Sequence, residues 1–80
     1  MKIVSITEIL HCNERIREKD LKFKIHLRDA CGKQSCWIES LDDQNSREQW
    51  GELYQALEEY FAGLRFQLEY GKDKTVFWLQ

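Results

Sequence analysis

The stretch LKFKIHLR, residues 21–28, alternates strictly between apolar side chains and side chains that are cationic or histidine. Because successive side chains of a strand point to opposite faces, this alternation predicts a strand over residues 21–29. One face of that strand is expected to be buried. The two faces carry these residues: Leu21, Phe23, Ile25 and Leu27 on one side, and Lys22, Lys24, His26 and Arg28 on the other.

Working outward, residues 29–33 (DACGK) supply a turn at Gly32, and residues 34–41 (QSCWIESL) are typical of the returning strand of a hairpin. A second hairpin is expected near the end of the chain. There, residues 64–70 (LRFQLEY) alternate, residues 71–74 (GKDK) turn, and residues 75–79 (TVFWL) form a last strand. These patterns predict two antiparallel hairpins.

Between the hairpins, the pattern changes to that of a helix. Ser46 followed by Gln49 is a capping box, and Gly63 is a typical helix stop. Apolar residues recur between them at three- and four-residue steps, which predicts an amphipathic helix of about 16 residues. The residues of this stripe are Trp50, Leu53, Tyr54, Leu57 and Phe61.

Residues 2–10 fit two interpretations. Their β-branched residues favour a strand, after which residues 11–20 would form a long loop. However, Ser5 and Glu8 also form a capping-box pattern, and Ile6, Ile9, Leu10 and Ile16 keep helical spacing. With the strand preferred, we expect a single α+β domain over residues 1–80. Its elements would run β-β-β-α-β-β, as a small antiparallel sheet with one amphipathic helix packed on one face.

The composition argues against several classes of protein. No apolar run approaches the roughly 20 residues of a membrane span, and no secretory signal is recognisable at the start. Three cysteines without such a signal are typical of free thiols in the cytoplasm. The residues show neither a phosphate-binding loop nor a nucleophile motif, and the spacing of His11, Cys12, Cys31 and Cys36 is poor for zinc. We therefore expect no enzyme, no cofactor and no metal, and no motif indicates a particular family.

Charge is unevenly distributed behind the net charge of −2: residues 39–59 carry one arginine and seven acidic residues. On the predicted helix, three glutamates lie opposite the apolar stripe, either as an ordinary solvated face or as a docking surface. We expect a non-enzymatic protein-binding module, a small inhibitor or adaptor of the kind encoded by phages and mobile elements, whose basic partner handles nucleic acid. The acidic candidates for partner binding are Glu48, Glu52, Glu59, Asp42 and Asp43.

The cationic face of residues 22–28 supports an alternative function. Its side chains repeat about every 6.6 Å, so Lys22, Lys24 and Arg28 could follow the phosphates of a nucleic acid. Against this, the net charge is negative and Phe23 points to the other face. The same lysines also suit a charged edge strand that resists pairing with other chains.

The last strand, residues 76–79 (VFWL), is apolar at four consecutive positions, so both of its faces require burial. A single helix covers one face only. The other face would present either Phe77 and Leu79 or Val76 and Trp78, joined by Trp37 or Ile38. A homodimer through this strand, a partner protein, or a lid formed by residues 11–20 would cover it. Phe77 and Trp78 therefore join the candidates for partner binding.

Overall fold

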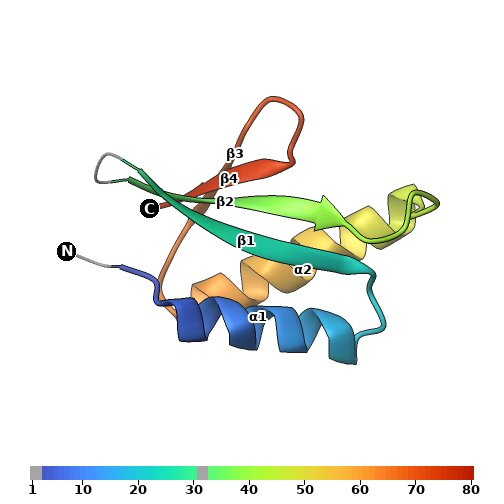
Figure 1. The fold of residues 1–80 in the computed structure, drawn as a ribbon, viewed down its shortest axis with the longest axis horizontal. Helices are drawn as coiled ribbons and strands as arrows, with labels where there is room; N and C mark the ends of the chain where they lie inside the picture. The colour runs from blue at the N-terminus through green and yellow to red at the C-terminus, as the bar shows by residue number, and fades with distance from the viewer. Residues whose placement is uncertain (1–2, 31–32) are drawn as a thin grey trace.

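The computed structural model describes residues 3–30 and 33–80, which fold as a small α+β domain with two helices and a four-stranded antiparallel sheet (Figure 1). The element order is α-β-β-α-β-β, so the predicted strand at the start of the chain is wrong. The elements are α1 Ile6–Glu18, β1 Phe23–Ala30, β2 Lys33–Ser40, α2 Arg47–Gly63, β3 Leu68–Tyr70 and β4 Val76–Leu79. Cys31 and Gly32, the centre of the predicted first turn, lie outside the described residues.

The sheet has the order β1-β2-β4-β3, and all of its neighbouring strands are antiparallel. Both predicted hairpins are confirmed, as β1 with β2 and β3 with β4. The last strand lies inside the sheet between β2 and β3, whereas β1 and β3 are the two edges. Strand β1, which carries the predicted cationic face, is therefore an edge strand.

Helix α1 replaces the predicted strand and the predicted loop after it. Ser5 caps the helix and forms the full capping box with Glu8. Its buried residues Ile9, Cys12 and Ile16 follow helical spacing. The strand interpretation failed because Ile3, Ile6 and Leu10 are exposed rather than packed in a second layer. Residues 11–18 lie within α1 and so do not form a lid over the sheet.

Helix α2 agrees closely with its prediction. Ser46 and Gln49 form the capping box, and the helix ends at Gly63. Leu53, Leu57 and Phe61 are fully buried, as the apolar stripe predicted.

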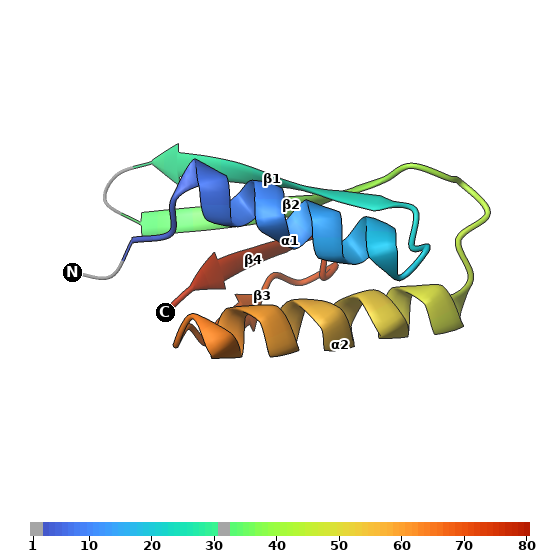
Figure 2. The same ribbon diagram turned by 90° about the horizontal axis from the view of Figure 1, so that it is seen from below.

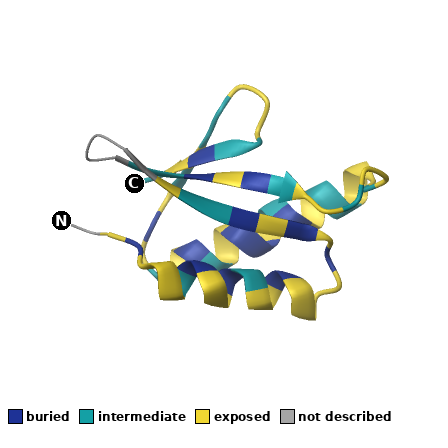
Figure 3. Ribbon diagram, in the orientation of Figure 1, coloured by how far each residue is buried: buried dark blue, intermediate teal, exposed yellow. Residues whose placement is uncertain are grey.

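The core lies between the sheet and the two helices, which both lie on the same side of the sheet (Figures 1 and 2). Two helices therefore cover the face of the sheet that a single helix was predicted to cover. Figure 3 shows burial alternating along β1 and β2, because every second side chain points toward the helices. The buried sheet residues that complete the core are Phe23, Ile25, Cys36, Ile38 and Phe77.

Candidate interface on the open sheet face

The side chains between the buried positions form the surface that we call the open sheet face. Strand pairing arranges them in three rows across the sheet. These rows are Lys24 and Glu39; His26, Trp37 and Val76; and Arg28, Ser35, Trp78 and Glu69. Both helices lie on the other side of the sheet, so neither of them covers these rows.

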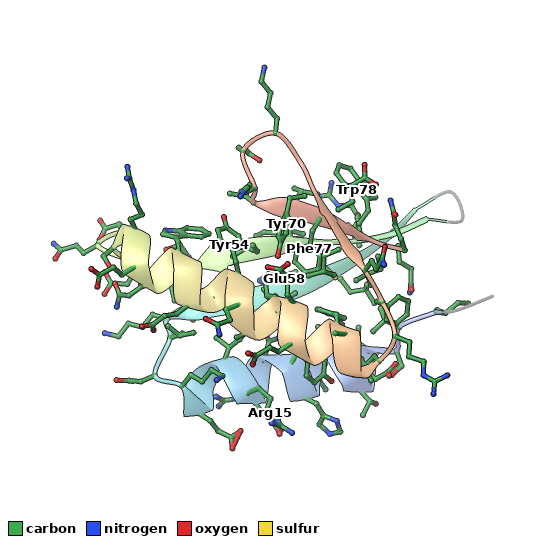
Figure 4. The ribbon with its side chains drawn as sticks, turned by 180° about the vertical axis from the view of Figure 1, so that it is seen from behind. Arg15, Tyr54, Glu58, Tyr70, Phe77 and Trp78 are labelled. Atoms are coloured by element: carbon green, nitrogen blue, oxygen red, sulfur yellow. The ribbon has the colours of Figure 1, made fainter. Side chains whose placement is uncertain are left out.

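The centre of the open sheet face is aromatic. Trp37 and Trp78 are 37 % and 38 % exposed, and Val76 beside them is half-buried. The Trp37 indole stacks on the His26 imidazole, with ring centroids 4.1 Å apart and planes inclined by 14°. Figure 4 shows Trp78 on the side of β4 away from α2, with Phe77 and Tyr70 on the side toward it. An exposed group of large apolar side chains like this one is typical of an interaction surface.

Polar and charged side chains surround this centre. His26 Nε2 lies 2.7 Å from Glu39 Oε1, which fixes the imidazole against Trp37. At the opposite edge, Gln80 donates a side-chain hydrogen bond to Glu69. A shallow depression of about 540 Å³ next to Trp78 is lined by Gln34, Glu69, Trp78, Leu79 and Gln80. The arrangement is an apolar centre with a polar rim, as protein interfaces have.

Of the three cations predicted to follow a nucleic acid, two lie on the open sheet face and one lies outside it. Lys24 and Arg28 lie on the open sheet face and are exposed. Lys22 precedes β1, and its Nζ lies 3.7 Å from Asp42 Oδ2. Trp37 and Trp78 share the face of Lys24 and Arg28 although they come from other strands. Sequence reasoning found no aromatic residue beside the cations because it considered β1 alone.

The structure corrects the prediction for Phe77, which was expected at a partner-binding surface but is 0 % exposed. Its ring packs edge-on against Phe61, with centroids 5.8 Å apart, and lies 6.0 Å from Tyr70. Phe77 faces the core because it is paired with the buried Cys36 in the register of β2 and β4. Of the two faces considered for the last strand, the one with Val76 and Trp78, joined by Trp37, is the open one.

The acidic candidates lie on α2 and the segment before it. Glu48, Glu52, Glu59 and Asp43 are exposed, and none of them forms an ion pair with any described residue. Asp42 is half-buried, pairs with Lys22, and accepts a hydrogen bond from the Gln44 backbone N–H. Glu48 lies in the first turn of α2, where the helix dipole favours a carboxylate. These side chains therefore form an acidic surface on the helix layer.

Burial shifts the pKa of several titratable side chains in and around the core. Burial raises the pKa of both Cys12 and Cys36 from 9.0 to about 12, so their thiols stay protonated at neutral pH. Burial, followed by the nearby charge of Glu58, raises the pKa of Tyr70, whose buried hydroxyl has no hydrogen-bond partner among the described residues. No group of three or more His, Cys, Asp or Glu side chains within residues 3–30 and 33–80 could hold a metal ion.

His26, Glu39 and Glu69 on the open sheet face were not among the predicted site residues. Alternation along each strand shows which residues of that strand share a face. Only the strand order brings these three residues together with Trp37 and Trp78.

Comparison of the chain with protein-family models, with curated proteins and with solved structures gave no match. Among the described residues, no helix combines the length and apolar character needed to pass through a bilayer.

Proposed function

We propose that this chain is a non-enzymatic protein-binding module whose main contact surface is the open sheet face. The observation that carries the proposal is the exposure of Trp37 and Trp78 at the centre of that face, with Arg28 on its rim. Tryptophan and arginine are enriched among the residues that dominate binding energy in protein interfaces. An exposed indole also loses unfavourable contact with water when a partner covers it.

The state of the reactive groups supports a binding role rather than a catalytic one. His26 is held between Glu39 and Trp37, and the thiols of Cys12 and Cys36 are buried and protonated. A nucleophile needs an accessible, activated group next to a base. Buried free thiols are also compatible with a reducing environment, so we propose that the protein acts in the cytoplasm without a cofactor.

A second contact surface in this proposal is the acidic surface of α2, defined by Glu48, Glu52, Glu59, Asp42 and Asp43. Its exposed carboxylates suit a basic partner, such as a protein that handles nucleic acid. A small inhibitor or adaptor of the kind carried by phages and mobile elements would act in this way, by class-level analogy. The acidic surface and the open sheet face belong to different layers, so both could be occupied together.

Single-stranded nucleic acid is the second candidate ligand, and a specific observation favours it. Lys24 and Arg28 share the open sheet face with Trp37 and Trp78, and cations beside exposed aromatic rings are the elements of a base-stacking surface. Glu39 and Glu69 on the same face oppose this ligand, because phosphates would approach two carboxylates. We therefore rank a protein partner first.

Affinity capture from the native host's lysate, with and without nuclease, tests the proposal. The bait variants are Trp78→Ser, the triple change of Glu48, Glu52 and Glu59 to lysine, and Ile6→Ser. Ile6 on α1 is the matched control, because it is an apolar residue 63 % exposed outside the sheet. A protein that resists nuclease and is lost with Trp78→Ser but kept with Ile6→Ser supports the open sheet face. Capture that disappears with nuclease supports nucleic acid instead, and equal capture by all variants contradicts both surfaces.

A further inference from the structure

The charges of the open sheet face are polarised across the strands. Lys24 and Arg28 lie on edge strand β1, whereas Glu69 lies on edge strand β3. The register connects these edges directly, since Arg28 is paired with Ser35, Ser35 with Trp78, and Trp78 with Glu69. Neither Arg28 nor Glu69 forms an ion pair with any side chain that the structure describes. One row thus carries a cation at one end, an indole within it and a carboxylate at the other end.

This polarity matters when two identical sheets pack face to face, because they are related by a twofold axis in the plane between them. An axis parallel to the strands places β1 opposite β3 and β2 opposite β4, given the order β1-β2-β4-β3. An axis perpendicular to the strands places each strand opposite its own copy. The second arrangement brings Lys24 opposite Arg28, which is repulsive.

With the axis parallel to the strands, each row of one copy instead faces the same row of the second copy in reverse order. Arg28 then lies opposite Glu69 of the second copy, and Glu69 opposite Arg28, so that two ion pairs close the edges. Between them, Trp78 faces Ser35 and Trp37 faces Val76, so each indole meets a smaller side chain. Aligned packing of two sheets with interdigitated side chains is a common architecture. The small-to-large pairing and the charge pairing thus select the same axis.

We infer that the open sheet face binds a second copy of this chain, as a twofold dimer with its axis parallel to the strands. This inference rests on the proposal that the face is an interface, and it names the occupant. β1 and β2 have eight residues each, β4 has four and β3 has three, so at about 3.3 Å per residue and about 4.8 Å per strand the face covers about 360 Å² per copy. The resulting total of about 700 Å² is smaller than a standard specific interface, so the dimer should be weak and should dissociate readily on dilution. The acidic surfaces of α2 would remain free on the two outer sides, which makes the dimer a bivalent ligand.

Sedimentation equilibrium of the purified chain, from about 5 µM to about 1 mM, measures this association directly. Arg28→Glu and Glu69→Arg should each weaken dimerisation about tenfold or more, since each change creates two like-charge contacts. The double variant, Arg28→Glu with Glu69→Arg, should restore it, because the charges exchange places. Arg17→Glu on α1 is the control and should change nothing, because this exposed arginine lies in the helix layer.

A strict monomer at every concentration would overturn the inference, and so would a double variant as weak as its single parents. A dimer insensitive to both single changes would show that another surface forms it. The two proposals can fail separately. If the protein is a monomer but its Trp78→Ser variant no longer captures a partner protein, the open sheet face is still an interface, and its occupant is that partner rather than a second copy. Binding of a single-stranded oligonucleotide that Glu69→Arg strengthens would likewise overturn the second copy as occupant.

Discussion

The side-chain amide of Asn13 in α1 forms two hydrogen bonds with the backbone of Ile25 in β1. The Ile25 N–H donates to Asn13 Oδ1 at 2.7 Å, and Asn13 Nδ2 donates to the Ile25 carbonyl at 3.0 Å. One amide thus takes the place of a neighbouring strand at the edge of the sheet. Free edges invite pairing with other chains, and here α1 occupies part of the edge that the lysines were expected to guard.

Replacing Asn13 by alanine should therefore lower stability and expose the edge. Two partly buried backbone groups would lose their partners, which costs about 1–3 kcal/mol of unfolding free energy. Urea denaturation measures this loss, and light scattering on storage should show increased aggregation. Glu14→Ala, next to it on α1 and exposed, is the control. Equal stability of the two variants would mean that water satisfies the edge just as well.

The core prediction concerns Leu57, which is fully buried in α2. Leu57→Ala should lose about 2–5 kcal/mol of unfolding free energy through lost burial and the cavity left behind. Because small domains often hold only a few kcal/mol, we expect the variant to be largely unfolded by circular dichroism. Gln55→Ala, exposed on the same helix, should remain folded. A well-folded Leu57→Ala protein would contradict the packing of α2 on the sheet.

The buried thiols predict a specific pH dependence. Burial raises the pKa of Cys12 and Cys36 from 9.0 to about 12, so between these values the unfolded chain releases thiol protons that the folded chain keeps. Stability from this source is fully present below pH 9 and falls as the pH rises toward 12. In a Cys31→Ser background, urea denaturation between pH 8 and pH 10 should show this decline. Replacing Cys12 and Cys36 by alanine in that background should flatten the decline.

The same background gives a kinetic test. Both thiols should resist iodoacetamide in the folded protein at pH 8 and react on unfolding, because only the accessible thiolate is nucleophilic. Mass spectrometry counts the modified cysteines. Rapid labelling of the folded protein would contradict the burial of Cys12 and Cys36.

Reversing the acidic surface should affect binding more than folding. Glu48, Glu52 and Glu59 are exposed, so their change to lysine removes no core contact. We expect unfolding free energy to change by less than about 1 kcal/mol, because relief of repulsion opposes the loss of a carboxylate at the start of α2. Capture of a basic partner should be abolished. Changing Glu14 and Glu18 of α1 to lysine is the control, and a triple variant that captures the partner as well as this control does would sink the acidic-surface mechanism.

Sequence patterns predicted α2 and both hairpins because each has local signals that tertiary packing reinforces. The Ser46 capping box, the apolar stripe through Leu57 and the alternation from residue 21 all agree with the structure. Helix α1 was missed because Ile3, Ile6 and Leu10, which are 63 %, 63 % and 55 % exposed, made its segment look apolar on two sides. Its true signal was the capping box of Ser5 and Glu8.

The open sheet face was only half predictable, for a different reason. Alternation places Val76 and Trp78 on one side of β4, but it does not say which side meets the helices. That choice depends on the long-range pairing of Cys36 with Phe77, which also brings Trp37 beside Val76. Phe77 was consequently expected at a surface although it belongs to the core.

Hydroxyl-radical footprinting of Trp37 and Trp78 measures whether these two side chains lie in an interface. Oxidation is compared, residue by residue, between dilute protein and protein that is concentrated or bound to its captured partner. Trp50, half-buried against Phe23, and exposed Ile6 serve as internal references. We expect Trp37 and Trp78 to become protected on assembly while both references stay unchanged. Assembly with undiminished oxidation of Trp37 and Trp78 would contradict it.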